Sequence, residues 1–167
     1  VVCKTFTVSA GNLNFVQESL YDVQIPVRLV LCMVDNDSFN GSYAKNPFNF
    51  KHYDLAQLKI FLDGTQQQIK PVEMDFADNA AQYMQAYLSL FEGTGKFGKD
   101  EGIDINREEY KNGYTILAFD ITPDQSERDH LNLQREGTVR LEARFKTALP
   151  NTINVICYTE FENFVYI

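Results

Sequence analysis

The feature that most constrains the fold of this chain is an apolar run at period two, YDVQIPVRLVLCMV, at residues 21–34. On an extended backbone one face carries Ile25, Val27, Leu29, Leu31 and Met33, and the other carries Val30, Cys32 and Val34. Because both faces are apolar, the run predicts a strand covered on both sides. The polar run DNDSFNGS at 35–42 follows, and its Asx residues and Asn-Gly pair predict a turn or exposed loop.

A second alternating segment, residues 54–63, predicts another strand and the hairpin that ends it. The residues expected to face inward are Ala56, Leu58, Ile60 and Leu62, with Gln57 and Lys59 facing out. Asp63-Gly64 is a strong hairpin signal, so a short return strand is expected at 66–70. Pro71 should end or edge that strand because proline has no N–H to donate to a ladder.

Three C-terminal segments also alternate and predict strands at 114–121, 139–145 and 153–161. The expected inward residues are Thr115, Leu117, Phe119 and Ile121, then Val139, Leu141, Ala143 and Phe145, then Ile153, Val155, Cys157, Thr159 and Phe161. In the first segment the opposite face, with Tyr114, Ile116 and Ala118, is apolar too. That strand should therefore be covered on both sides.

The period changes between residues 77 and 91, where spacings of three and four predict one helix. Its stripe comprises Phe76, Ala80, Tyr83, Met84, Tyr87, Leu88 and Phe91. Asp78 can cap or charge the start and Gly93 can terminate the helix. A polar loop at 92–104 and a short helical turn at 106–110 should follow.

The 167 residues, 44% of them apolar, suffice for one compact domain over 1–167 whose core needs no disulfide or metal. The 13% aromatic content suits half-buried pleated surfaces. With strands, long loops and one helix, we expect an all-β, jelly-roll (Greek-key) sandwich with one inserted helix.

Charge and cysteine usage exclude several classes of protein. Fifteen basic against twenty-three acidic residues give a net charge of −8, which opposes nucleic-acid binding. No apolar run approaches a membrane span, and Val1–Ala10 lacks the pattern of a signal peptide. Cys3, Cys32 and Cys157 have no metal or disulfide spacing, so reduced, buried thiols are expected. The glycosylation patterns at Asn36 and Asn40 should then be unused, because we expect a protein that is not secreted.

Two short motifs resemble ligand loops without meeting their requirements. GTGK at Gly93–Lys96 lacks the first glycine of a phosphate loop, has Phe97 in place of Ser or Thr, and follows a helix instead of a strand. The run Asp35–Asp37 begins like a calcium loop, but Phe39 stands at the third ligand position and Asn46 at the terminal glutamate position. We interpret both as solvated loops.

Candidate catalytic groups are few. His52 and His130 lie near Asp54 and Asp129, but no serine or cysteine is placed as an activated nucleophile. A loop around Pro123 carries the acids Asp120, Asp124, Glu127 and Asp129, which could bind calcium or act on a glycoside but are read as a solubilising loop. The sequence thus predicts no catalytic, cofactor-binding or metal-binding residues, no cofactor and no enzyme.

Apolar residues also occupy positions expected to face outward. They include Tyr114, Ile116, Ile156, Tyr158 and the run FENFVYI at 161–167. Either the helix and long loops cover them in a thick core, or they contact a second domain or subunit. The pattern alone leaves both explanations open.

Three segments resemble capsid-type proteins of Polinton/Maverick-like and adintovirus-like elements, residues 24–64, 87–124 and 137–163. The most specific stretches are VDNDSFNGSYAKNPFNF at 34–50 and NGYTILAFDITPD at 112–124. This resemblance implies a structural protein of the double jelly-roll major capsid lineage, in which pseudo-hexagonal trimers tile a shell. A chain of this length would supply one jelly roll of a larger two-jelly-roll protein.

The resemblance implies self-association or neighbouring capsid subunits as partners, with a trimer expected, and a place in the virion after assembly in the host cytoplasm or nucleus. It carries no catalytic motif. A single-jelly-roll penton or minor capsid protein is one alternative. A jelly-roll module that binds carbohydrate or another ligand is the other, because one fold hosts many functions.

Overall fold

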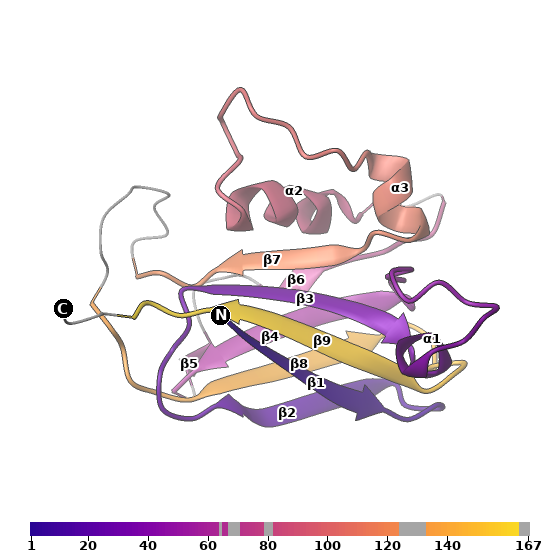
Figure 1. The fold of residues 1–167 in the computed structure, drawn as a ribbon, viewed down its shortest axis with the longest axis horizontal. Helices are drawn as coiled ribbons and strands as arrows, with labels where there is room; N and C mark the ends of the chain where they lie inside the picture. Colours follow the sequence, from indigo (N-terminus) through magenta and orange to yellow (C-terminus); the bar gives the residue numbers. More distant parts are fainter. Residues whose placement is uncertain (64, 67–70, 79–81, 124–132, 164–167) are drawn as a thin grey trace.

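The computed structural model describes residues 1–63, 65–66, 71–78, 82–123 and 133–163. It consists mainly of antiparallel strands, with short helices between them (Figure 1). The strands are β1 (Val2–Val8), β2 (Asn14–Tyr21), β3 (Arg28–Asp35), β4 (Leu55–Leu62), β5 (Thr65–Gln66), β6 (Val72–Glu73), β7 (Ile116–Asp120), β8 (Val139–Phe145) and β9 (Ile153–Glu160). The helices are α1 (Asn36–Asn40), α2 (Met84–Gly93) and α3 (Arg107–Asn112).

The strands form two sheets that pack face to face. Sheet A has the order β1-β9-β3-β7, and sheet B has the order β2-β8-β4-β5 with β6 also paired to β4. Neighbouring strands are antiparallel throughout. Most neighbours within a sheet are distant in sequence, since β1 pairs with β9 and β2 with β8. The predicted mainly β architecture is thus confirmed.

The core lies between the sheets and is filled by alternate residues of each strand. The predicted inward faces of β3, β7, β8 and β9 are buried, as are Ile25 and Ile121 just outside the strands. In β4 the prediction needs one correction. A bulge between Leu55 and Gln57 turns Leu55 inward and leaves Ala56 half-buried, after which Leu58, Ile60 and Leu62 alternate as expected.

The hairpin after β4 is present, and β5 is the described part of its return strand. β5 pairs Thr65 with Leu62 and Gln66 with Phe61, and residues 67–70 lie outside the described residues. Beyond Pro71, β6 pairs with the first half of β4. Both short strands lie at the edge of sheet B.

The prediction of one inserted helix was too low, since the described residues include three helices. α1 occupies the segment expected to be a loop, because the Asp35 carboxylate accepts the N–H of Asp37 and caps a short helix. α3 confirms the predicted turn and carries a capping box between Asn106 and Glu109. It buries Tyr110 completely.

The predicted start of α2 was also wrong, since the helix begins at Met84 and not near Ala77. Phe76 is buried, but it precedes the helix, and Asp78 forms an ion pair with Lys111 instead of capping α2. Its end agrees with the prediction, because Gly93 is its last residue. α2 packs along β7, and a Cβ on Gly93 would lie 2.5 Å from the carbonyl carbon of Ala118. This close approach explains why glycine stands there.

Candidate interaction surface

The residues considered as phosphate or calcium ligands have partners within the chain. Lys96 forms an ion pair with Glu101 at 2.7 Å, and its backbone N–H closes the C-terminal turn of α2 on the carbonyl of Phe91. Asp35 accepts Lys45 Nζ at 3.0 Å and the side-chain amide of Asn151 at 3.3 Å. Lys96 therefore belongs to the C-terminal end of α2, and Asp35 belongs to a loop contact with Lys45.

His52 packs against Phe76, in the segment that precedes α2. Its Nδ1 accepts the backbone N–H of Asp54 at 2.9 Å, and its ring stacks on Phe76 with 4.1 Å between centroids. Burial lowers the pKa of His52, and the nearby charge of Lys111 acts in the same direction while Asp54 opposes it. The bond from Asp54 requires a neutral Nδ1, so the hydrogen bonding and the lowered pKa agree.

Of the remaining candidates, the structure describes only Asp120. Asp120 accepts the N–H and hydroxyl of Thr122 in a local turn. His130, Asp124, Glu127 and Asp129 lie outside the described residues. Among the residues that the structure describes, no three His, Cys, Asp or Glu side chains are grouped to hold a metal ion. No helix in this part of the chain is both long and apolar enough to cross a membrane.

The outward face of sheet A is apolar at its centre. Strand register aligns Cys3, Tyr158, Val30 and Ala118 in one row across the four strands, and Thr5, Ile156, Cys32 and Ile116 in the next. α2 covers the β7 end of these rows, on the side of the molecule away from β1 (Figure 1). We call the remainder the outer apolar face, made of Cys3, Val30, Cys32, Ile156 and Tyr158.

Polar pairs border the outer apolar face along the strands. At one end Arg28 forms an ion pair with Glu160 at 2.8 Å. At the other end the Thr7 hydroxyl donates to the Asn154 side-chain oxygen at 2.8 Å. Tyr158 remains 40% exposed between them. An apolar centre with a polar rim is the usual composition of a protein interface.

The expectation of buried thiols holds for Cys157 alone. Cys157 faces the core, Cys32 is half-buried and Cys3 is exposed, and none of the three forms a disulfide. Burial raises the pKa of both Cys32 and Cys157 to about 12. Cys3 differs because it lies on the outward side of an edge strand, and the sequence analysis did not identify that strand.

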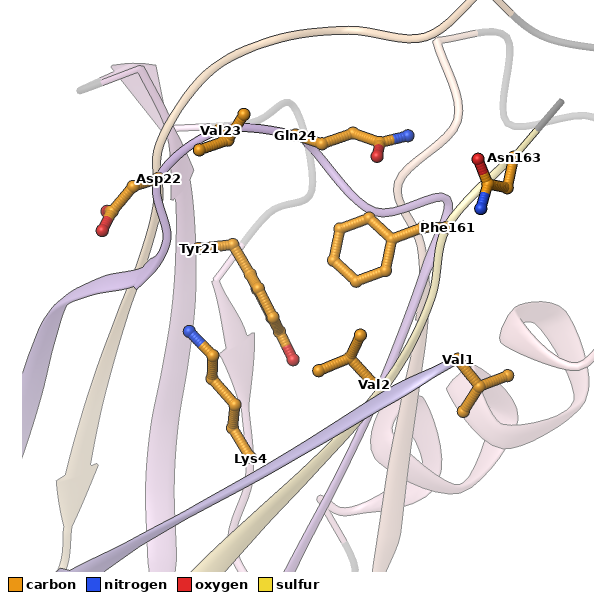
Figure 2. Close-up of a pocket in the computed structure, with 9 residues that line it drawn as sticks. All are labelled: Val1, Val2, Lys4, Tyr21, Asp22, Val23, Gln24, Phe161 and Asn163. Carbon is orange, nitrogen blue, oxygen red and sulfur yellow. The ribbon is translucent and has the colours of Figure 1, made fainter.

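A hollow of about 570 Å³ opens beside the first residues of β1 (Figure 2). Its walls are Val1, Val2, Lys4, Tyr21, Asp22, Val23, Gln24, Phe161 and Asn163. Tyr21 and Phe161 pack edge to face at 5.1 Å, and the Lys4 ammonium stands 4.5 Å over the Tyr21 ring. Tyr21 also shares a 2.6 Å hydrogen bond with the hydroxyl of Thr159, and burial raises its pKa.

The β1 side of this hollow was not predicted from the sequence, because no strand was expected at residues 2–8, whereas Phe161 was expected to face inward. VCKTFTV at 2–8 does alternate, with Lys4, Phe6 and Val8 on one side, and this signal could have been used.

Comparison with known proteins gives one informative match. The chain is 29% identical over 163 residues to an uncharacterized protein of Caenorhabditis elegans, which covers 95% of this chain. The chain spans 38% of the length of that relative. No model of a known protein family matches the chain.

Proposed function

We propose that this chain is a structural subunit of a viral-type protein shell, built on a jelly roll, and that it has no enzymatic activity. Two features support the fold. Apart from the short strands β5 and β6, which follow β4 within sheet B, successive strands alternate between the sheets, with β1, β3, β7 and β9 in sheet A and β2, β4 and β8 in sheet B. Each sheet also interleaves early and late strands, as two superposed Greek keys do.

The observation that carries the proposal is the outer apolar face with its polar rim. A protein that acted alone would gain no stability from leaving Tyr158 exposed and Ile156 only half-buried on this face. A neighbouring subunit of the same shell would bury them. The resemblance of residues 24–64, 87–124 and 137–163 to capsid-type proteins of Polinton/Maverick-like elements supports this occupant.

The same resemblance implies a parent protein, an oligomeric state and a location for the chain. The chain would be one jelly roll of a larger double jelly-roll protein, would assemble into trimers with its neighbours, and would reside in the virion. A net charge of −8 favours contacts with protein over contacts with nucleic acid.

A carbohydrate-binding module is the alternative, and the hollow beside β1 gives it little support. Sugar-binding sites present flat aromatic faces. Here Tyr21 and Phe161 pack against each other, and Lys4 occupies the ring face of Tyr21. The shell role therefore accounts for more of the molecule.

Sedimentation velocity over a range of concentrations tests the shell role. We expect the chain to self-associate, with a trimer as the main product, and the Ile156→Glu variant to remain a monomer. Val16→Glu is the matched control, because Val16 is an exposed apolar strand residue of sheet B. A monomer at all concentrations, or equal loss of association in both variants, would overturn the proposal.

A further inference from the structure

β1 forms one edge of sheet A. Within the part of the chain that the structure describes, β1 pairs only with β9, so its other edge has no ladder partner. Only Val8 of this strand is buried. Alternate N–H and C=O groups along this edge are therefore available to another chain.

The hollow lies against the same edge, between β1 and the residues that follow β2 (Figure 2). The first two residues of its β1 wall are apolar and open to solvent, since Val1 is 75% and Val2 42% exposed. Val23 on the opposite wall is 75% exposed. A strand added beside β1 would point every second side chain toward this hollow, because successive side chains of a strand face opposite ways.

Lys4 gives the hollow a positive charge. Its ammonium donates to the carbonyl of Leu20 and stands over the Tyr21 ring. No carboxylate of the described residues forms an ion pair with it, and Figure 2 shows Asp22 turned away from Tyr21 and Phe161. A lysine on the inner side of an edge strand disfavours pairing with a second copy of that strand, because its charge would be covered without a counter-charge.

We infer that β1 accepts an extended segment of a partner chain, in which an acidic residue is flanked two positions away on both sides by apolar residues. The backbone of the segment would extend sheet A, its acid would pair with Lys4, and its apolar residues would cover Val2 and Val23. Two features support this occupant, the positive charge of Lys4, which is opposite to that of the acid, and the unpaired edge of β1. It does not depend on the shell role, which concerns the outer apolar face.

Fluorescence anisotropy with labelled peptides tests this inference. The probes are the seven-residue peptide TVTETVT, its TVTKTVT counterpart, and a TVTETVT peptide N-methylated at alternate residues. We expect the chain to bind the glutamate peptide about fivefold more tightly than the lysine peptide, as one half-exposed ion pair allows. N-methylation should abolish binding, because it removes the ladder donors.

Exchange of the charge supplies the decisive comparison. Lys4→Glu should reverse the preference between the two peptides, while Lys51→Glu, an exposed lysine outside the hollow, should leave it unchanged. Circular dichroism identifies a variant that fails to fold, and Lys4→Met then replaces it, with loss of the preference expected. Absence of binding to the wild-type chain, equal binding of both peptides, or a preference that survives Lys4→Glu would overturn the inference. If the Ile156→Glu test fails while peptide binding remains, only the shell role is contradicted.

Discussion

Single residues hold this fold where two elements approach more closely than side chains normally allow. Gly93 is the clearest case, because the last turn of α2 lies directly on the backbone of Ala118. The packing of α2 on β7 thus depends on glycine, which has no Cβ, at this position. Tyr110 of α3 stabilises the same region with a large side chain, which is fully buried and packs against Tyr83 and Tyr87.

Gly93→Ala should destabilise the protein by about 1–3 kcal/mol, since the added methyl would force α2 away from β7. Urea unfolding followed by circular dichroism measures the change. Gly102→Ala is the control, because a Cβ there meets nothing within 4 Å, and it should change stability by less than about 0.5 kcal/mol. Equal effects of the two substitutions would contradict the close packing at Gly93.

The three thiols should differ sharply in reactivity with a maleimide under native conditions at neutral pH. Cys3 is exposed and should react first. Cys32 and Cys157 should react slowly, because burial restricts access and their raised pKa of about 12 leaves almost no thiolate. Mass spectrometry after digestion assigns the labelled site. Early labelling of Cys157 would show that β9 does not bury it.

Elements of the molecule were predictable to very different degrees. β3, β4, β7, β8 and β9 follow from alternation, because buried strand faces must be apolar. β1 and β2 were missed because their apolar alternation is interrupted. Lys4 occupies an inward position of β1, and a register shift lies between Gln17 and Tyr21 in β2. The outer apolar face was foreseen only as an excess of apolar residues. Its location required the strand register, which places Cys3 beside Tyr158 although the two are far apart in sequence.

The turn that leads into β4 depends on an unusual backbone conformation. Tyr53 and Asp54 both have positive φ, 46° and 52°, which residues other than glycine rarely adopt. Several hydrogen bonds hold this turn, including one from the N–H of Leu55 to the carbonyl of His52 at 2.9 Å. His52 accepts the N–H of Asp54, and the carbonyl of Asp54 accepts the N–H of Lys146 at 2.8 Å.

Protonation of His52 should therefore destabilise the protein. Its pKa in the folded state lies below the ordinary value of 6.5, so the unfolded chain takes up the proton first. The free energy of unfolding should fall as the pH drops below about 6.5 and level off below the folded pKa. Urea unfolding at a series of pH values from 7.5 to about 5 measures this slope.

The control is His52→Asn, which does not titrate and should flatten the slope in that range. The same variant assigns the His52 imidazole signal in a proton NMR titration. A titration midpoint at or above 6.5 would contradict the burial of the ring.

At the scale of the whole molecule, stability rests on one layer of side chains shared by both sheets. Leu31 from sheet A and Leu141 from sheet B are both fully buried in this layer. Neither sheet can retain its packing once the other has separated. We therefore expect the two sheets to unfold together.

Leu31→Ala and Leu141→Ala should each lower the free energy of unfolding by about 2–5 kcal/mol, as the loss of a buried leucine side chain does. In both variants, far-ultraviolet circular dichroism and the exposure of Cys157 should report the same midpoint. Val16→Ala, on an exposed position of β2, should leave the midpoint nearly unchanged. Separate midpoints for the two probes would show that the sheets unfold independently.

The pairing of β1 with β9 also has a consequence for synthesis on the ribosome. β1 cannot form its ladder until β9 has been synthesised, because Val8 aligns with Ile153 and no other strand of the described residues pairs with β1. At roughly 5–20 residues per second, that delay is on the order of 10–30 s. Throughout it the apolar inner sides of β1 and β3 lack their common neighbour β9. Nascent chains of this protein should therefore depend on factors that shield exposed strands until translation reaches the C-terminal segment.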